Sequence, residues 1–365
     1  MRNDLLLSHK NFKPFPTGTV ENPIEITTTD KPLKKQVTIK YPSRLNAMAI
    51  DPSQIAVKSD KRKFMPGEVV FIVDLFATIK VLYLDNGLEK IETTHKRSSI
   101  IKHSAGIMKK ALDFKGSLYI EVSGDEYKHT GLGSSGRIMA GVASAINELF
   151  QSPIKPDVLI KYLAQNHGEE IEGNINFLMP VQCIGGSASA GMFDGACKII
   201  TGESTVICSE NITNDYYFVI GWPSDFTPPD AQKAMSAEFK NIEMFYRIGK
   251  TYGDKIAYRV LHEMLPAIRQ NDFYTVGNII EWYRFELGSI KACSFTYPNL
   301  EKIGRNLLIL RRELLADIVS PTSVGPGFFA LTKQPDLCKD YFENLQLTTI
   351  TSKPCNSKYK VVEVN

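Results

Sequence analysis

Short runs in the first half of the chain alternate between apolar residues and more polar ones. Leu118, Ile120 and Val122 form the clearest run, with Tyr119 and Glu121 between them. A period of two places every second side chain on the same face of a sheet, so these runs predict strands. The elements predicted in this half are strands over 36–39, 69–75, 79–84 and 117–122 and a helix over 100–112.

The spacing of apolar residues becomes helical after residue 135. Ile138, Val142 and Ile146 fall on one stripe, as in an amphipathic helix. A second helix is predicted over 157–172, because Pro156 precedes it and a glycine follows it. The remaining predicted elements are strands over 196–200, 216–222, 328–332 and 347–351 and helices over 231–250, 255–269, 273–293 and 298–316.

The order of these elements predicts an α+β fold with two lobes. Residues 1–34 contain several prolines and no apolar period, so we expect an irregular N-terminal arm. Strands dominate directly after the arm, and helices mix with strands later, as in α+β proteins. We predict an N-terminal domain over 35–210 and a C-terminal domain over 211–365.

The composition is that of an ordinary globular protein. Of 365 residues, 43% are apolar and 23% charged, and 43 basic against 40 acidic side chains give a net charge of +3. This near balance argues against nucleic acid or a membrane surface as a partner. The 6 cysteines form no C-x-x-C pair, which argues against a zinc ribbon. No apolar run approaches the ~18 residues of a membrane-spanning helix. We therefore expect a cytoplasmic protein, with a homodimer as the commonest assembly.

A glycine- and serine-rich segment before the helix at 138–150 carries the clearest chemical signal. Glycines allow the backbone to approach a ligand closely, serines cap the helix and donate hydroxyls, and the helix start presents free N–H groups. The segment therefore predicts a phosphate site, although a capped helix after a flexible turn is the simpler alternative. It fits neither the Walker nor the Rossmann pattern. The predicted phosphate-binding residues are His129, Thr130, Gly131, Gly133, Ser134, Ser135, Gly136 and Arg137.

Three blocks in order resemble the GHMP kinase superfamily, which includes galactokinase and the homoserine, mevalonate and phosphomevalonate kinases. Residues 131–136 are similar to its phosphate loop, 41–46 to its N-terminal block and 320–331 to its C-terminal glycine-rich block. The resemblance implies a two-lobe GHMP-type fold with the ligand site between the lobes. It also implies that the last block supports the site from the second lobe, through Ser323, Gly325 and Gly327.

Within that superfamily, four segments resemble beta-ribofuranosylaminobenzene 5'-phosphate synthase and related ribosyl-transferring enzymes. They are 42–51, 263–277, 322–326 and 352–356. This resemblance implies that phosphoribosyl pyrophosphate reacts with an aromatic or heteroaromatic carboxylate, with loss of pyrophosphate and CO2, and that Mg2+ assists. Asn46 stands where that branch usually has histidine, and the glycine-rich segment 173–195 is longer than its counterpart.

A second small-residue run keeps a kinase hypothesis open. Residues 191–194 resemble the step of GHMP kinases at which an aspartate acts near the acceptor hydroxyl and an upstream glutamate helps to hold magnesium. The candidate catalytic residues are accordingly Asp194, Arg44 and Glu169, and the candidate metal ligands are Ser135 and Glu172. Glu169 and Glu172 share a face if they end a helix.

Simpler roles remain open for these residues. Glu169 and Glu172 could form a solvated acidic helix end, and Asp194 could be a turn residue. An ATP-dependent small-molecule kinase is thus the alternative to ribosyl transfer, since phosphoryl transfer needs the same loop and magnesium. A non-catalytic relative that only binds a phosphate ligand is the third hypothesis. In each case the partners are small molecules: phosphoribosyl pyrophosphate or ATP, plus an acceptor.

Overall fold

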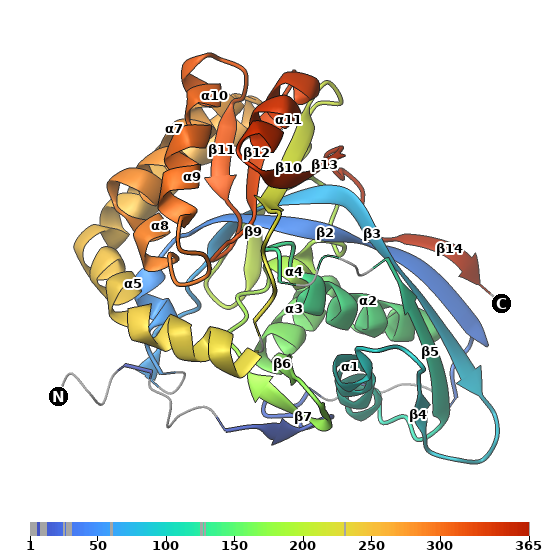
Figure 1. The fold of residues 1–365 in the computed structure, drawn as a ribbon. Helices are drawn as coiled ribbons and strands as arrows, with labels where there is room; N and C mark the ends of the chain where they lie inside the picture. The colour runs from blue at the N-terminus through green and yellow to red at the C-terminus, as the bar shows by residue number, and fades with distance from the viewer. Residues whose placement is uncertain are drawn as a thin grey trace.

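The computed structural model describes residues 6–7, 13–24, 26, 31–58, 61–124, 127, 129–229 and 231–364, with the side chains of 231 and 232 left out. Two mainly antiparallel sheets, each covered by helices, form the two lobes (Figure 1). The α+β prediction is therefore confirmed.

The sheet of the first lobe has the strand order β14-β2-β3-β5-β4, and β8 joins it by pairing with β3 and β9. The small sheet β1-β7-β6 lies below it in Figure 1. The strands are β1 (Phe15–Pro16), β2 (Gln36–Ala49), β3 (Glu68–Leu84), β4 (Ile91–Glu92), β5 (Ser117–Ser123), β6 (Gly168–Ile171), β7 (Asn174–Pro180), β8 (Cys197–Thr201), β9 (Thr205–Glu210) and β14 (Lys360–Val364).

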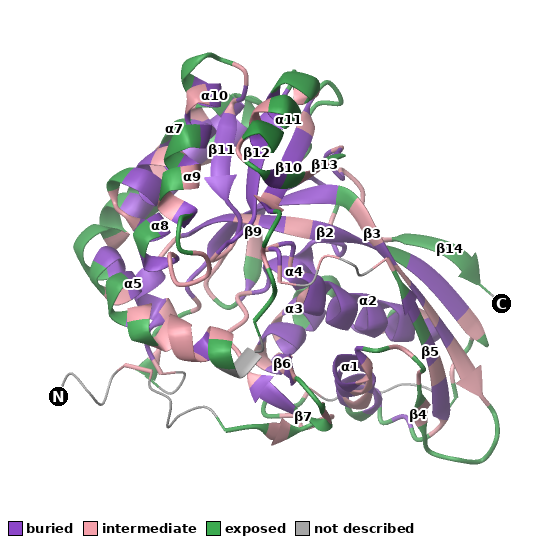
Figure 2. Ribbon diagram, viewed as in Figure 1, coloured by how far each residue is buried: buried purple, intermediate pink, exposed green. Residues whose placement is uncertain are grey.

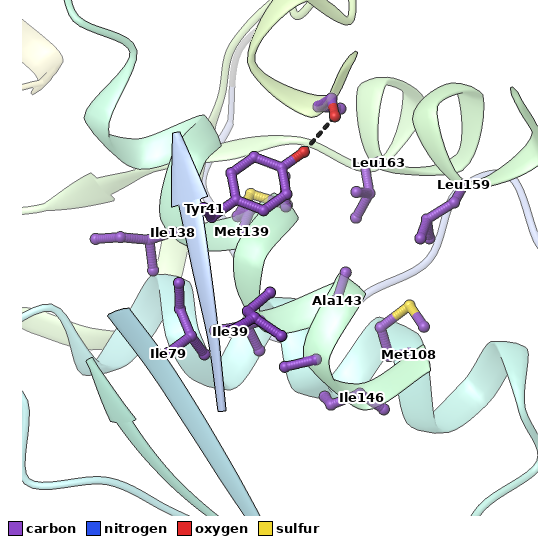
Figure 3. Close-up of a cluster of buried hydrophobic side chains, with 14 of the residues drawn as sticks. Ile39, Tyr41, Ile79, Met108, Ile138, Met139, Ala143, Ile146, Leu159 and Leu163 are labelled. Atoms are coloured by element: carbon purple, nitrogen blue, oxygen red, sulfur yellow. Dashed lines mark hydrogen bonds between the residues drawn. The ribbon is translucent and has the colours of Figure 1, made fainter. Parts of the chain in front are cut away.

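Helices α1 (Ser98–Ala111) and α2 (Ser134–Leu149) pack on one face of this sheet, with α3 (Pro156–Gln165) and the short α4 (Gly186–Ser189) beside them. Figure 3 shows the resulting core, in which Ile39 and Ile79 from the strands meet Ile138 and Ala143 from α2. The hydroxyl of Tyr41 donates a hydrogen bond to the carbonyl of Ala188, which fastens α4 over the same core.

The second lobe holds the sheet β11-β12-β10-β13, with helices on both of its faces. Its strands are β10 (Tyr217–Pro223), β11 (Ile318–Pro321), β12 (Phe328–Thr332) and β13 (Leu347–Ser352). Its helices are α5 (Ala231–Arg259), α6 (Leu265–Arg269), α7 (Phe273–Glu281), α8 (Ser289–Ala292), α9 (Leu300–Leu307), α10 (Ile309–Arg312) and α11 (Pro335–Asn344). Single π-helical turns, Val260–Met264 and Trp282–Glu286, join α5 to α6 and follow α7.

The middle of β3 forms a wall that both lobes share. Val70 and Ile72 belong to the core under α2, whereas Val69, Phe71 and Val73 belong to the core that continues into β10, β12 and α7. Because successive side chains point to opposite faces, a run that is apolar at every position indicates burial on both faces. Figure 2 accordingly shows most of α2 and long stretches of the central strands as buried.

Several predicted elements are confirmed, and others are wrong in extent. Strand β5, helices α1 and α2, and the late strands β12 and β13 lie where the patterns placed them. The predicted pair 69–75 and 79–84 is instead the single strand β3. The predicted helix 157–172 stops at Gln165, because the chain then enters β6, which pairs with β7.

The two ends of the chain also join the sheets. Within the described part of the N-terminal arm, β1 pairs with β7, and at the other end β14 pairs with β2 of the first lobe. The domain boundaries at 34/35 and 210/211 stay predictions. Among the described residues, no helix combines the length and the apolar character that crossing a membrane requires.

Candidate functional site

The glycine-serine segment forms a tight loop that opens directly into α2. Gly131 and Gly133 have φ angles of 89° and 66°, a left-handed backbone that glycine adopts without strain. A Cβ on Gly133 would lie 2.6 Å from Ser187 Oγ, so the loop also packs too closely for a larger residue. The loop therefore brings its backbone to the start of α2, where helix N–H groups can bind an anion.

Two distant segments hold this loop in place through hydrogen bonds to Gly131. The hydroxyl of Thr322 donates to the carbonyl of Gly131 (2.9 Å) and accepts from the backbone N–H of Asn46 (3.1 Å). Arg44 donates from Nη1 to the same Gly131 carbonyl (3.1 Å) and from Nε to Ser187 Oγ (3.3 Å). The three blocks singled out in the sequence thus meet at one place.

A cavity of about 360 Å³ opens beside the loop, between the lobes. Its walls come from β2 and β3, from the loop, from the segment after β7, and from α5 and the turn after α7 of the second lobe. Ten predicted site residues line it: Arg44, His129, Gly131, Gly133, Ser134, Ser135, Gly136, Glu169, Ser323 and Gly325.

Two further predicted residues lie behind the cavity wall. A Cβ on Gly327 would approach the carbonyl oxygen of Thr130 to 2.2 Å, so these backbones are in close contact. They support the loop without lining the cavity.

A charged cluster lies at the first turn of α2. Arg97 donates to Ser134 Oγ (3.2 Å) and to Ser135 Oγ (2.5 Å), and its Nε is 2.6 Å from an oxygen of Glu170. Ser135 in turn donates to Oε1 of Glu169 (2.7 Å). All described hydrogen bonds to Glu169 end on Oε1, so Oε2 is available to a ligand.

The electrostatics of the cavity differ from one wall to another. Burial alone raises the pKa of Glu169, but the charges of His129 and Arg97 and the Ser135 hydrogen bond outweigh it and hold that pKa below its ordinary value. Burial lowers the pKa of His167 to about 4, so this histidine is neutral at physiological pH. Burial raises the pKa of Glu238, on the α5 wall, to about 6.

The structure places three predicted site residues away from the cavity. Arg137 is buried and donates to Ser43 Oγ and to the carbonyls of Leu75 (3.0 Å) and Gly124 (2.9 Å), because its position on α2 faces the sheet. Arg137 therefore fastens α2 to the sheet and does not line the cavity, so its geometry gives no support to the predicted phosphate contact.

Asp194 and Glu172 are both exposed. The carboxylate of Asp194 accepts from the backbone N–H of Lys358 (2.9 Å) in the turn before β8, which is the simpler role considered for it. Glu172 lies in the β6–β7 turn, and it does not share a helical face with Glu169 because Glu169 belongs to a strand. Neither lines the cavity, so the catalytic role of Asp194 and the metal role of Glu172 lose their support.

Ser135 and Glu169 are the described residues whose oxygens could hold a magnesium ion beside the loop. Within the described ranges, no group of three or more His, Cys, Asp or Glu side chains forms a ready-made metal centre. Mg2+ nevertheless binds typically through one or two protein oxygens plus substrate phosphates. A hydroxyl next to an ionised carboxylate, beside a phosphate-type loop, fits that need.

Several charged residues of the cavity were given no role by the sequence analysis. Glu68 is buried and accepts from the backbone N–H of Gly186 (2.7 Å) and from the side-chain amide of Asn46. Arg284 and Glu238 line the wall from the second lobe. No local sequence pattern marks Glu68, Glu238 or Arg284 as cavity residues, because only the tertiary packing of the chain turns their side chains inward.

A second, open hollow of about 760 Å³ lies on the outer face of the second lobe, around Trp282. Two of its cations are paired with acids: Arg259 with Glu263 (2.9 Å) and Arg311 with Glu281 (2.8 Å). It lies away from the phosphate-type loop, so we assign the candidate site to the cavity between the lobes.

The comparisons with known proteins agree with this geometry. Residues 99–181, which include the loop, α2 and Glu169, match the GHMP kinases N terminal domain. No curated protein matches the chain in sequence.

Solved structures resemble about 90% of the chain. Homoserine kinase from Cytophaga hutchinsonii ATCC 33406 is 14% identical over 90% of this chain and 98% of its own, with a TM-score of 0.56. Mevalonate diphosphate decarboxylase from Staphylococcus aureus is 14% identical over the same shares, with a TM-score of 0.61. Mevalonate kinase from L. major, in complex with R-mevalonate, is 12% identical over 89% and 99%, with a TM-score of 0.59. Residues 99–181 are therefore similar to the GHMP kinases N terminal domain, and the chain has the two-lobe GHMP-type fold.

Proposed function

We propose that the protein is an enzyme of the transferase class that acts on a magnesium-bound polyphosphate substrate. The observation that supports this is the arrangement of Ser135 and Glu169 at the first turn of α2, beside the backbone of the loop. The loop N–H groups bind phosphate oxygens, and Ser135 with Oε2 of Glu169 would hold Mg2+. The metal, when bound, neutralises charge on the leaving phosphate group.

The first specific reaction we propose is transfer of ribose 5-phosphate from phosphoribosyl pyrophosphate to an aromatic or heteroaromatic carboxylate. The bond between C1 of the ribose and the pyrophosphate oxygen breaks, and pyrophosphate leaves with the electron pair. A ring carbon of the acceptor bonds to C1, and the carboxylate leaves as CO2 while its bonding electrons restore the ring. The protein's share in this reaction is positioning and electrostatic stabilisation. The sequence blocks that resemble ribosyl-transferring enzymes support this choice.

Phosphoryl transfer from ATP to a small-molecule hydroxyl is the second candidate, and Glu238 is the observation that favours it. A kinase benefits from a group that takes the proton of the acceptor hydroxyl, and Asp194 lies outside the cavity. Glu238 lines the cavity, and no described residue donates a hydrogen bond to its carboxylate. With its pKa near 6, this carboxylate is ionised at neutral pH and suited to accept a proton.

Product analysis distinguishes the two reactions. The protein is incubated with Mg2+ and either phosphoribosyl pyrophosphate or ATP, in the presence and absence of candidate acceptors. Acceptor-dependent release of pyrophosphate and CO2 supports ribosyl transfer, whereas acceptor-dependent ADP formation supports the kinase. Binding of either polyphosphate without turnover would support the non-catalytic hypothesis, and absence of Mg2+-dependent binding would refute the proposed site.

The variant Glu238→Gln adds a second criterion. If Glu238 takes a hydroxyl proton, its loss lowers kcat for phosphoryl transfer by roughly 100- to 10,000-fold. In the ribosyl reaction the attacking ring carbon loses CO2 and no proton, so Glu238→Gln is not expected to lower kcat in this way.

A further inference from the structure

The second-lobe wall of the cavity contains a buried cation that no described carboxylate neutralises. Arg284 is 3% exposed, and it donates from Nε to the carbonyl of Ala47 (2.6 Å) and from its Nη atoms to Ser289 Oγ (3.4 Å) and the carbonyl of Asn46 (3.4 Å). These acceptors are neutral, and no described acid forms an ion pair with this guanidinium. A buried charge without a counterion is costly, so an anion that binds beside it removes part of that cost.

The surroundings of Arg284 indicate what kind of ligand would supply the negative charge. On the same side of the cavity, α5 contributes the apolar side chains of Met235, Ile242 and Phe245, together with the carboxyl group of Glu238. Arg284 itself comes from the π-helical turn after α7, on the second-lobe side. The polar groups suited to a polyphosphate, by contrast, lie on the first-lobe side, at the loop and at Arg44. A second, smaller anion with an apolar body therefore fits the α5 side better than the polyphosphate does.

We propose that Arg284 binds the anionic group of the acceptor, so that the second-lobe wall is a subsite for a small organic acid whose apolar body packs against α5. This inference rests on the proposed function, because the polyphosphate occupies the other half of the same cavity. An arginine guanidinium has five N–H donors, and the three described hydrogen bonds leave donors for a carboxylate. Arg284 thereby selects acids over neutral molecules of the same shape.

The test uses small acids and their uncharged amides as probes of the full-length protein. Binding of benzoate, cyclohexanecarboxylate and 4-methylpentanoate is measured by calorimetry against the three matching amides, with Mg2+ and pyrophosphate present. We expect at least one acid to bind roughly 10-fold or more tightly than its amide, the size of effect that a charge-assisted hydrogen bond gives. Equal binding of acid and amide throughout the panel would overturn the proposal.

Variants then assign the selectivity to one residue. Arg284→Gln should lose the preference for the acid and retain binding of magnesium pyrophosphate. The matched control is Arg311→Gln, which also removes a buried arginine of the second lobe but lies outside the cavity and should retain the preference. If Arg284→Gln binds the acids as tightly as the unmodified protein does, Arg284 does not bind the acceptor. The same conclusion follows if the variant loses as much affinity for magnesium pyrophosphate as it loses for the acids.

Two details keep this test separate from that of the proposed function. Arg284 also ties β2 to the second lobe, so if Arg284→Gln fails to fold, the comparison of acids with amides on the unmodified protein decides the matter. Pyrophosphate is titrated separately with Mg2+. Failure of that titration counts against the polyphosphate site, whereas absence of acid selectivity counts against the acceptor subsite.

Discussion

Replacing Glu238 by glutamine should stabilise the protein at alkaline pH. The pKa of this carboxyl rises on folding from an ordinary 4.5 to about 6, because burial disfavours the charged form. Below pH 4.5 the group is protonated in the folded and the unfolded chain, and it costs nothing. As the pH rises through 4.5 to 6, the unfolded chain releases its proton first, so stability is lost over that interval.

The size of the effect follows from the two pKa values. A difference of about 1.5 units corresponds to about 2 kcal/mol at pH 8 and to about 0.8 kcal/mol at pH 5. These figures are upper limits, because solvent screens a carboxylate that is partly exposed. Glu238→Gln carries no charge at any pH, so it should gain up to that amount over the unmodified protein at pH 8 and almost nothing at pH 4.

Urea unfolding at pH 4, 5, 6, 7 and 8 measures this difference directly. Glu172→Gln, on the exposed β6–β7 turn, controls for the exchange of carboxylate for amide. A gain that is the same at every pH, or a loss at pH 8, would show that Glu238 is not held in a cavity that disfavours its charge. A pH-dependent gain would indicate that the residue is retained at a cost in stability, as is common for residues needed for function.

Four further predictions concern the loop and its surroundings. Gly133→Val should abolish the Mg2+-polyphosphate thermal shift, because the Cβ meets Ser187, whereas Gly173→Ala, in an open turn with φ of 74°, should lose only about 1 kcal/mol and keep the shift. A normal ligand shift in Gly133→Val would contradict the assignment of the loop. Glu169→Gln should raise the Mg2+ concentration needed for half-maximal polyphosphate binding about tenfold or more, and an unchanged Mg2+ titration would remove this residue from the metal site. Asp194→Asn should leave turnover within twofold, and a loss above 100-fold would restore it as a catalytic residue. Arg97→Met breaks a buried pair with Glu170, so chemical unfolding should reveal a loss of about 3 kcal/mol, and a loss below 1 kcal/mol would show that the cluster is not structural.

The loop was predictable from the sequence because its chemistry is local. Positive φ at Gly131 and Gly133 and the serines at the start of α2 are properties of consecutive residues. Support of the loop by the block 320–331 was implied for a different reason, the resemblance of ordered blocks, and the residue of that block that bonds to Gly131 is Thr322. Local signals and block order together therefore predicted most of the first-lobe side of the cavity.

The acidic segment shows where local reasoning fails. Residues 168–171 continue the polar and apolar spacing of α3, and the sequence alone favours one longer helix there. Pairing with β7 overrides that preference, and it turns Glu169 toward Ser135 and leaves Glu172 on the surface. Secondary-structure propensity is a weak influence that tertiary contacts often reverse. Because of the error in this one helix boundary, Glu172 was predicted as the metal ligand in place of Glu169.

The second-lobe side of the cavity depends on a close contact that the sequence disguises. Separate helices were predicted over 231–250 and 255–269, and α5 instead continues through Gly249 and Gly253 to Arg259. A Cβ at Gly249 would lie 2.2 Å from the backbone nitrogen of Ser53, so this glycine lets α5 rest directly on the short 3-10 helix Pro52–Ile55. Ile55 and the part of α5 that contains Glu238 line the same cavity. The glycine that weakens the helical pattern is therefore what allows α5 to close the site, because close packing of two backbones leaves no room for a side chain.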